Sequence, residues 1–533
     1  IDVKVTNTGS VAGKEVVELY FDPPYTNGGI EKASANLLNF GKTGLLQPGA
    51  SETVSFTFTY DDLASYDTYG HGCYVTEKGD YEISIRSDSH NIIDTRTVTV
   101  AKDIIYNAAN DGKRASDNIA AENLFGFAEG NVTYRSRSDH FANYAEATAA
   151  PSQEAYSMTP EQKATTVVMS TWKPEDHDDP SDVMPTMGAK NGLTIYDMKG
   201  VSYSDSKWDS LLDEMTFDEM ARLVGIGGYQ TAAVSSIGLP ATVQSDGPSC
   251  LNANMAQNVD SGVSFACGTM IAQTWNKDLA YLRGSNIGKQ ADEMHITGWY
   301  GPATDTHRSA FSGRNFEYYS EDGVLAGYIC AAEVKGAREH GVLAYMKHFA
   351  LNDQETNRVR QIMTWANEQS IREIYLKSFE LGAKEGKANA VMSSFNFIGN
   401  RWAGGLKELL TNVLRDEWGF EGVVVTDWFL GDMSGYMDAD LASRSGGDQM
   451  LSATGTGGAT VSDTSATATI ALRNSSKNIL YGLAQTKLID WGSTTPAWER
   501  LLKGVNIGFA VVAVAAEAVL IYSFIKSRKA QNK

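Results

Sequence analysis

The residues EGVVVTDWFLGD (421–432) carry the strongest fold signal in this chain of 533 residues. Their apolar run is short and continuous and ends in Asp427, which predicts a strand buried on both faces of a parallel sheet. Other compact apolar runs have the same form: ATVQS (241–245), TGWYG (297–301), VLAYM (342–346) and NAVMSS (389–394).

Helical patterns separate these predicted strands. They are WDSLLDEMTFDEMARLVG (208–225), SEDGVLAGYICAAEVKGAREHG (320–341), for which Ser320 is the expected N-cap, and NEQSIREIYLKSFELGAKEG (367–386). Alternation of strands and helices favours a parallel sheet with crossover helices, and a barrel is the natural closure of such a sheet. We therefore expect an α/β TIM-like barrel over residues 191–490.

Several of the predicted strands run directly into a polar residue at their C-terminal ends. In an α/β barrel this rim is where active sites are built. Asp427 is suited to attack the anomeric carbon of a sugar, because cleavage with retention needs an ionised carboxylate beneath that carbon. The neighbouring Trp428 offers an aromatic face for the apolar side of the sugar, although a lone tryptophan is more often a core residue.

Further motifs place cations and a carboxylate near the same rim. SDGPS (245–249) contains Asp246, and GRNFEYYSEDG (313–323) contains Arg314. KHFALNDQETNR (347–358) contains Lys347, His348 and Arg358. Such side chains give the charge-assisted hydrogen bonds that hold several sugar hydroxyls.

Each of these residues also has a purely structural alternative. Asp246 could cap the turn before Gly247 and Pro248. Arg314 could pair with Glu317 or Glu321, Lys347 could pair with a residue such as Glu355, and His348 could be a satisfied core histidine.

Taken in order, SDGPS, GRNFEYYSEDG, KHFALNDQETNR and the T-D-W at 426–428 resemble glycoside hydrolase family 3. The resemblance implies a retaining, exo-acting β-glycosidase, most directly a β-glucosidase, that removes terminal non-reducing sugars from oligosaccharides or glycosides. It implies Asp427 as the nucleophile and no metal or organic cofactor. It places these residues around the sugar in the −1 subsite: Asp246, Arg314, Lys347, His348, Arg358 and Trp428.

The chain departs from the pattern of the family at two positions. Phe395 stands where many members carry a tyrosine that contacts the nucleophile, and Asn252 stands where many carry a sugar-binding arginine. The motif at 347–358 also lacks the Asp-His acid/base pair of the N-acetylglucosaminidase branch. In the β-glucosidase-like branch the acid/base is a glutamate of a separate α/β sandwich domain, which this sequence does not contain.

The first part of the chain predicts a β-sandwich. Residues 1–101 hold short alternating runs such as EVVELYF and DYEISIRS between turn signals, and they resemble a fibronectin-type-III-like domain. Residues 102–190 are polar and lack periodicity, so we expect an ordered linker. Because the sequence starts inside a strand pattern, we expect a permuted order from which an N-terminal α/β sandwich domain of the same polypeptide is missing. That domain would supply the acid/base Glu, and the fragment alone would be nearly inactive on unactivated glycosides.

The last segment, residues 491–533, has the pattern of a membrane anchor. VNIGFAVVAVAAEAVLIYSFI (505–525) is about as long as the roughly 20 residues that a transmembrane helix needs, and KSRKAQNK follows it. Glu517 interrupts the apolar run, and a buried or amphipathic helix is the alternative. We expect a single-pass protein of a bacterial cell membrane with its catalytic part outside.

Composition excludes some classes of function. A formal net charge of −20 repels a phosphate backbone, so nucleic acid is not an expected partner. The four cysteines form no CxxC pair and suggest buried thiols instead of a metal site. Two alternatives to a β-glucosidase stay open: a non-catalytic surface carbohydrate-binding or scaffold protein, and a β-xylosidase or α-arabinosidase.

Overall fold

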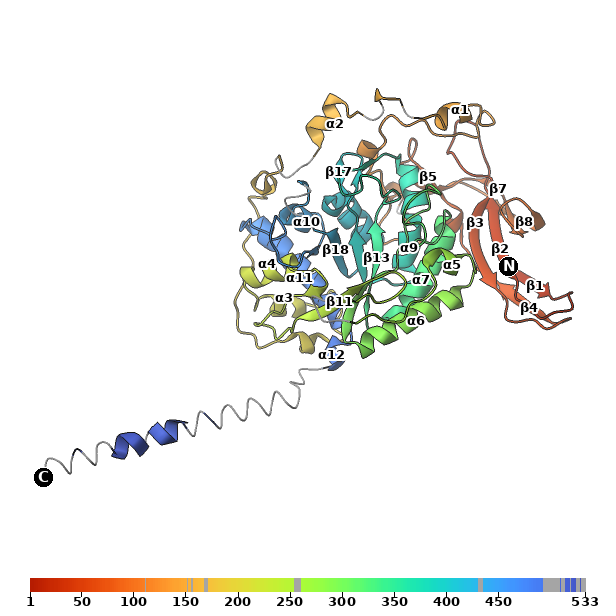
Figure 1. Ribbon diagram of the computed structural model, residues 1–533. Coiled ribbons are helices and arrows are strands. Elements are labelled where there is room, and N and C mark those ends of the chain that lie inside the picture. Colours follow the sequence, from red (N-terminus) through yellow and green to blue (C-terminus); the bar gives the residue numbers. More distant parts are fainter. Residues whose placement is uncertain are drawn as a thin grey trace. The chain divides into compact units, whose positions relative to one another are not determined.

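The computed structural model describes residues 1–110, 112–150, 152–154, 157–166, 171–253, 260–429 and 435–491, with 509, 513–517, 519–523 and 528. The chain divides into two compact units, Ile1–Lys487 and Leu488–Lys533. The first unit holds the sandwich, the linker and the barrel domain, which are drawn in Figure 1 from red to blue.

The N-terminal sandwich is built from short antiparallel strands. One sheet has the order β3-β2-β7-β8 and the other pairs β1 with β4. Leu19, Leu38, Tyr81 and Ile83 belong to one buried apolar cluster, against which residues of β1 and β4 pack, which confirms the predicted sandwich. Its strands are β1 Asp2–Thr6, β2 Val16–Asp22, β3 Asn36–Lys42, β4 Ser51–Ser55, β7 Gly79–Arg86 and β8 Ile92–Val100.

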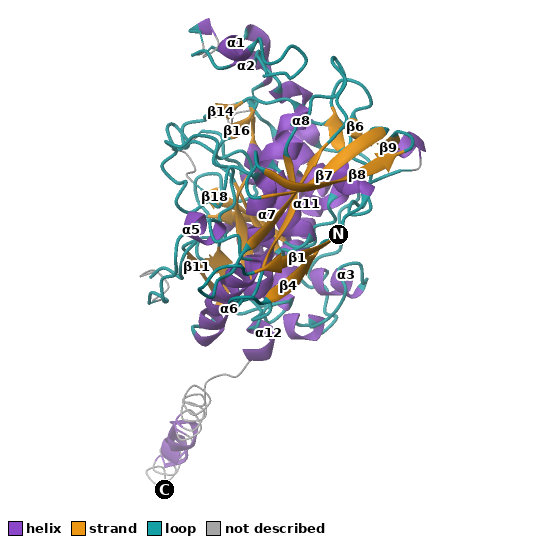
Figure 2. Ribbon diagram, turned by 90° about the vertical axis from the view of Figure 1, so that its right-hand side faces the viewer, coloured by secondary structure: helices purple, strands orange, loops and turns teal. Residues whose placement is uncertain are grey.

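A further small sheet, in the order β5-β6-β9, follows the sandwich. It consists of β5 Ser65–Asp67, β6 Cys73–Thr76 and β9 Ile104–Tyr106. Figures 1 and 2 show the sandwich beside the barrel domain, and β3 contacts helix α7 (Gly323–Arg338) there.

The barrel domain is organised by a sheet in the order β10-β11-β12-β13-β15-β18-β19. Neighbours from β11 onward are parallel, whereas β10 runs antiparallel to β11, so the barrel is not the all-parallel TIM arrangement. The strands are β10 Gln230–Thr231, β11 Thr242–Asp246, β12 Ile296–Tyr300, β13 Leu343–Phe349, β15 Ala390–Ser393, β18 Val423–Trp428 and β19 Gln449–Leu451.

Backbone hydrogen bonds bring the two ends of this sheet together. Gly227 N–H donates to Met450 O and Gly228 N–H donates to Ser452 O, both at 2.9 Å. A Cβ on Gly227 would lie 2.6 Å from the Met450 carbonyl oxygen, so this close approach requires glycine. The contact closes the sheet into a barrel-like ring, as the alternation of strands and helices predicts.

Helices cover the outside of the ring, with α6 and α7 at one side and α4 and α11 at another (Figure 1). Helix α7 begins after Asp322, whose carboxylate accepts from the N–H groups of Val324 and Leu325; the expected N-cap at Ser320 is therefore wrong by two residues. The longer helices are α4 Phe217–Gly225, α6 Lys277–Glu293, α9 Lys377–Lys384 and α11 Ala466–Ala484, with π-helical turns at Ile371–Tyr375 and Glu408–Glu417.

Short elements complete the first unit. A small sheet has the order β14-β16-β17. These elements are β14 Met363–Thr364, β16 Phe397–Ile398, β17 Arg401–Trp402, α1 Tyr144–Ala147, α2 Pro160–Thr165, α3 Lys207–Leu212, α5 Gly268–Ala272, α8 Glu368–Ser370 and α10 Ala439–Arg444.

The linker is anchored to the barrel domain by buried ion pairs. Arg114 contacts Asp117 at 2.8 Å and Glu380 of α9 at 2.6 Å, and Asp117 forms an ion pair with Lys384 of α9. The Arg114 guanidinium also lies 3.7 Å from the centre of the Tyr74 ring in β6. The linker therefore makes fixed contacts with both neighbouring domains, although its polar composition does not predict them.

A titratable contact joins β5 to the barrel domain and gives a testable pH dependence. Glu373 accepts the backbone N–H of Tyr66, and burial raises the pKa of Glu373 from its usual 4.5 to about 7. The folded chain therefore binds the proton of the Glu373 carboxyl more tightly than the unfolded chain does. The stability that this proton contributes to the fold is fully present below about pH 4.5 and is lost as the pH rises through about 7.

As the pH rises from about 5 to about 8, we expect the free energy of unfolding of the unmutated protein to fall by on the order of 2 kcal/mol relative to that of the Glu373→Gln variant. Glutamine keeps an oxygen for the Tyr66 N–H but does not titrate. Urea unfolding of both proteins across this range measures the difference. Stability curves that stay parallel would contradict the role of Glu373.

The second unit, Leu488–Lys533, corrects the expected membrane anchor. It contains the short helix α12 (Leu488–Trp491). Much of the segment 505–525 lies outside the described residues. No helix in the described part of the chain is long and apolar enough to span a membrane. The predicted transmembrane helix and the cell-membrane location inferred from it are wrong.

Candidate active site

The predicted site residues come from the C-terminal ends of strands that share one sheet. Asp246 is the last residue of β11, Lys347 and His348 lie in β13, and Asp427 lies in β18. Parallel strands present their C-terminal ends at the same edge, so residues distant in sequence meet there. The loops after β12 and β13 add Arg314 and Arg358.

One ion pair joins β11 and β13. Lys347 Nζ lies 2.7 Å from Asp246 Oδ1, which also accepts the N–H of Gly247 at 2.7 Å. Burial alone would raise the pKa of Asp246, but the Lys347 ammonium outweighs it and lowers that pKa below the usual value. The turn after Asp246 is held by Asn252, whose N–H donates to Asp246 O at 2.8 Å. Asp246 is therefore an ionised hydrogen-bond acceptor and does not merely cap a turn.

A second cluster surrounds Asp427, which is 8% exposed. Oδ1 accepts the N–H of Trp428 at 2.6 Å, and Oδ2 forms an ion pair with the guanidinium of Arg358. His348 Nε2 lies 3.6 Å from Oδ2, which is beyond hydrogen-bond distance. Arg358 and the Trp428 N–H therefore hold the carboxylate in one position.

His348 is neutral in this environment. Burial is the main cause that lowers the pKa of His348 well below its usual value, and the cations Arg314, Arg358 and Lys347 lower it further. The ring contacts the hydroxyl of Tyr318 at 3.1 Å through Nδ1. A neutral histidine can donate to a sugar hydroxyl from one nitrogen and accept on the other.

Three buried residues that sequence reasoning missed support this arrangement. Asp305 accepts the backbone N–H of His348 at 2.6 Å and of Asn352 at 3.0 Å. Asn352 in turn accepts from Arg358 Nε at 2.8 Å and donates to Tyr318 at 3.0 Å. The sequence signal for Asp305 is weaker, because it lies four residues beyond the predicted strand 297–301, whereas Asp246 directly follows 241–245. Asn352 and Tyr318 lie inside the quoted motifs but have no chemistry of their own that would single them out.

Arg314 and Trp428 lie at the edge of the cluster. Arg314 Nε lies 2.5 Å from Glu317, the structural alternative expected from the sequence, and its guanidinium lies 6.0 Å from the centre of the Tyr318 ring. Trp428 is 38% exposed and its ring centre lies 5.9 Å from that of Tyr229. Trp428 is thus available as an exposed aromatic face and is not a core residue.

Comparison with known proteins identifies the family. Residues 216–456 match the family described as "Glycosyl hydrolase family 3 N terminal domain", and residues 15–89 match "Fibronectin type III-like domain". The chain belongs to glycoside hydrolase family 3. The fibronectin-like domain precedes the family 3 domain, as the sequence motifs predict.

Relatives and a solved structure agree with this assignment. "Beta-glucosidase A" of Butyrivibrio fibrisolvens is 34% identical over 439 residues, which is 80% of this chain and 51% of the relative. "Beta-glucosidase" of Ruminococcus albus is 30% identical over 448 residues, covering 80% of this chain and 43% of the relative. A "novel beta-glucosidase from Paenibacillus barengoltzii" has a TM-score of 0.67 at 25% identity, over 92% of this chain and 53% of that one. The chain thus spans about half the length of the curated relatives it matches.

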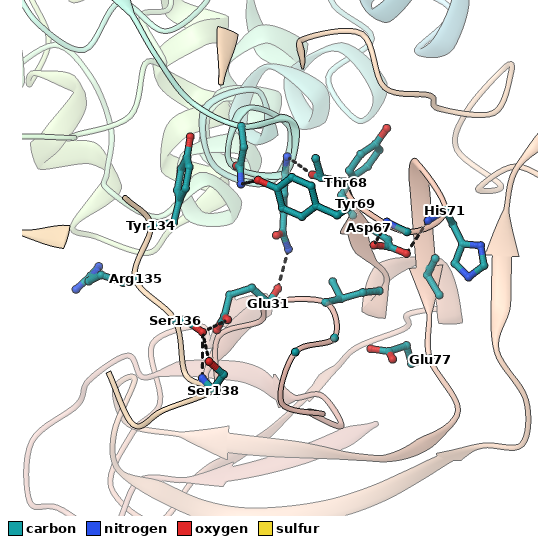
Figure 3. A pocket seen from close by; sticks show the side chains of 18 of the residues that line it. Glu31, Asp67, Thr68, Tyr69, His71, Glu77, Tyr134, Arg135, Ser136 and Ser138 are labelled. Carbon is teal, nitrogen blue, oxygen red and sulfur yellow. Dashed lines mark hydrogen bonds between the residues drawn. The ribbon is translucent and has the colours of Figure 1, made fainter. Parts of the chain in front are cut away.

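A cavity of about 550 Å³ lies elsewhere, where the sandwich, the linker and the barrel domain meet (Figure 3). Its carboxylates are occupied by the protein itself. Glu31 accepts from Ser136 and from the N–H of Arg137, and Asp67 accepts the N–H groups of Gly70 and His71. None of the family 3 motif residues lines it. In the described ranges, no group of three His, Cys, Asp or Glu residues is arranged to hold a metal ion.

Proposed function

We propose that this chain carries the nucleophile half of a retaining, exo-acting β-glycosidase of the β-glucosidase type. The observation that carries the proposal is the Asp427 carboxylate at the end of β18, ion-paired with Arg358. Asp427 would attack the anomeric carbon, forming a bond from its oxygen to that carbon as the bond to the leaving oxygen breaks. The names of the relatives, all β-glucosidases, favour glucose as the sugar.

The −1 subsite in this proposal is formed by the residues around that carboxylate. Asp246, held ionised by Lys347, would accept hydrogen bonds from sugar hydroxyls, while Lys347 and neutral His348 would donate to them. Arg358 would pass from Asp427 to the sugar as the negative charge of the nucleophile is consumed. Trp428 would pack against the sugar face, and Arg314 would contribute from the edge of the site.

We propose further that the acid/base glutamate belongs to an α/β sandwich domain outside this chain. Two described carboxylates near Asp427 are held by cations, Asp246 by Lys347 and Glu317 by Arg314. A carboxylate that a neighbouring cation holds ionised is a poor proton donor. The coverage of only about half of each relative is consistent with a second functional part elsewhere.

A covalent trap tests the proposal. A fluorinated β-glucoside with a dinitrophenolate leaving group needs no proton donor, so the chain alone should form a stable glycosyl-enzyme. Intact-mass spectrometry and peptide mapping should find one added fluoroglucosyl group, on Asp427. Glucose binding without covalent labelling would favour a non-catalytic carbohydrate-binding protein instead. Labelling only by the xylose or arabinose analogue would change the assigned sugar and keep the chemistry.

A further inference from the structure

Tyr436 carries a buried hydroxyl that no described residue satisfies. The residue lies between β18 and α10, is 1% exposed, and its Oη has no hydrogen-bond partner within the described ranges. Buried polar groups in folded proteins are nearly always paired, because an unpaired one keeps its full desolvation cost. Within the described residues, the Tyr436 hydroxyl is therefore free to donate a hydrogen bond.

The ring of Tyr436 is fixed by its neighbours. Its centre lies 5.1 Å from that of Phe397 in β16 and 6.0 Å from that of Trp402 in β17, both in edge-on geometry. Such packing restricts the side chain to a narrow range of orientations. The hydroxyl is thus held in place and is not free to turn toward solvent.

A chain of contacts connects Tyr436 to the residues around the nucleophile. Phe395, two residues before Phe397, lies 4.7 Å beneath the guanidinium of Arg358, which is the ion-pair partner of Asp427. Strand β15, which leads to Phe395, is registered beside β18 with Met392 opposite Val425.

The charged side chains that affect the pKa of Tyr436 are Asp427 and Arg358 of the candidate active site. Burial is the largest cause that raises the pKa of Tyr436 above its usual value; the Asp427 carboxylate raises it further and Arg358 opposes this. The phenol therefore stays protonated and can serve only as a hydrogen-bond donor toward a carboxylate. Those two side chains are also the pair that must separate when a sugar enters.

We propose that Tyr436 is a catalytic residue whose hydroxyl donates a hydrogen bond to the Asp427 carboxylate while Arg358 turns to the substrate. The inference rests on the proposed function of Asp427. The proton stays on Tyr436 throughout: the bond from carbon to the leaving oxygen breaks, the bond from Asp427 to carbon forms, and the hydroxyl orients the carboxylate and later stabilises the charge that returns to it. It adds to the site a group that the family motifs do not mark.

Tyr436→Phe in the full chain tests this directly, with the activated fluoroglucoside as probe. We expect the maximal rate of Asp427 labelling to fall about 10- to 100-fold, with little change in the probe concentration giving half-maximal rate. The thermal midpoint should stay or rise, because an unpaired buried hydroxyl is removed. A purely structural role for Tyr436 would instead lower the midpoint and leave the rate unaltered.

Tyr203→Phe is the matched control. The Tyr203 hydroxyl donates to Asn478 at 2.6 Å, away from the site, so its loss should lower the thermal midpoint and leave labelling unaffected. Equal labelling rates in the unmutated chain and Tyr436→Phe would overturn this inference and leave the proposed function standing. Absence of labelling in the unmutated chain would overturn both.

Discussion

Replacing Asp427 with asparagine is expected to lower the release of dinitrophenolate from its β-glucoside by about 10⁴-fold or more, because an amide cannot form the glycosyl ester. The amide keeps the size of the side chain and can still accept from the N–H of Trp428. Stopped-flow absorbance of the first turnover measures the effect without requiring an acid/base residue.

Asp438→Asn is the matched control for this substitution. Asp438 lies on the same connection after β18 and caps α10 through the N–H of Leu441. Asparagine is an equally good N-cap, so the control should keep both stability and the first-turnover rate. A first-turnover rate for Asp427→Asn close to that of the control would remove Asp427 from the mechanism.

The largest expected effect on stability comes from Arg372, far from the active site. Its guanidinium contacts Glu368 at 2.7 Å and Glu417 at 2.8 Å, and donates to the Glu122 carbonyl oxygen of the linker at 2.8 Å. Arg372→Met leaves two buried carboxylates without their cation, so we expect the free energy of unfolding to fall by about 3–5 kcal/mol. Urea unfolding at neutral pH measures this loss.

Two further variants separate this cause from simple loss of packing. Changing Glu368 and Glu417 to glutamine in the Arg372→Met background removes the unpaired charges and should recover part of the stability. Arg96→Met breaks an exposed ion pair with Asp94 and should change stability by less than about 1 kcal/mol. Equal small losses for Arg372→Met and Arg96→Met would show that the buried network does not stabilise the fold.

The barrel strands and the cationic rim could be predicted from sequence because their signals are local. A buried parallel strand has a short apolar run as its sequence pattern, so β11, β13 and β18 can be recognised. The polar residue that ends each run indicates the C-terminal rim of the barrel. The helix pattern at 320–341 is equally clear, although its start was two residues off because Ser320 and Asp322 are both good N-caps.

Features that depend on contacts between distant segments could not be predicted in this way. Arg114 meets Glu380 across 266 residues, and Tyr436 meets Phe397 from a different connection of the barrel. The antiparallel direction of β10 is set by a turn and by closure against β19, not by a periodic pattern. The prediction of an anchor at 505–525 rested on apolar content and length alone, and neither depends on contacts with the rest of the chain.

The identity of Asp427 as the nucleophile is tested most directly by chemical rescue of Asp427→Gly with azide, using the dinitrophenyl β-glucoside. The vacated space should let azide attack from the face that the carboxylate occupied, so we predict restored turnover and an α-glucosyl azide with inverted configuration, identified by NMR. A β-glucosyl azide would mean that Asp427 acts on the leaving-group side. Activity in Asp427→Gly equal to that of the unmutated chain without azide would contradict the account altogether.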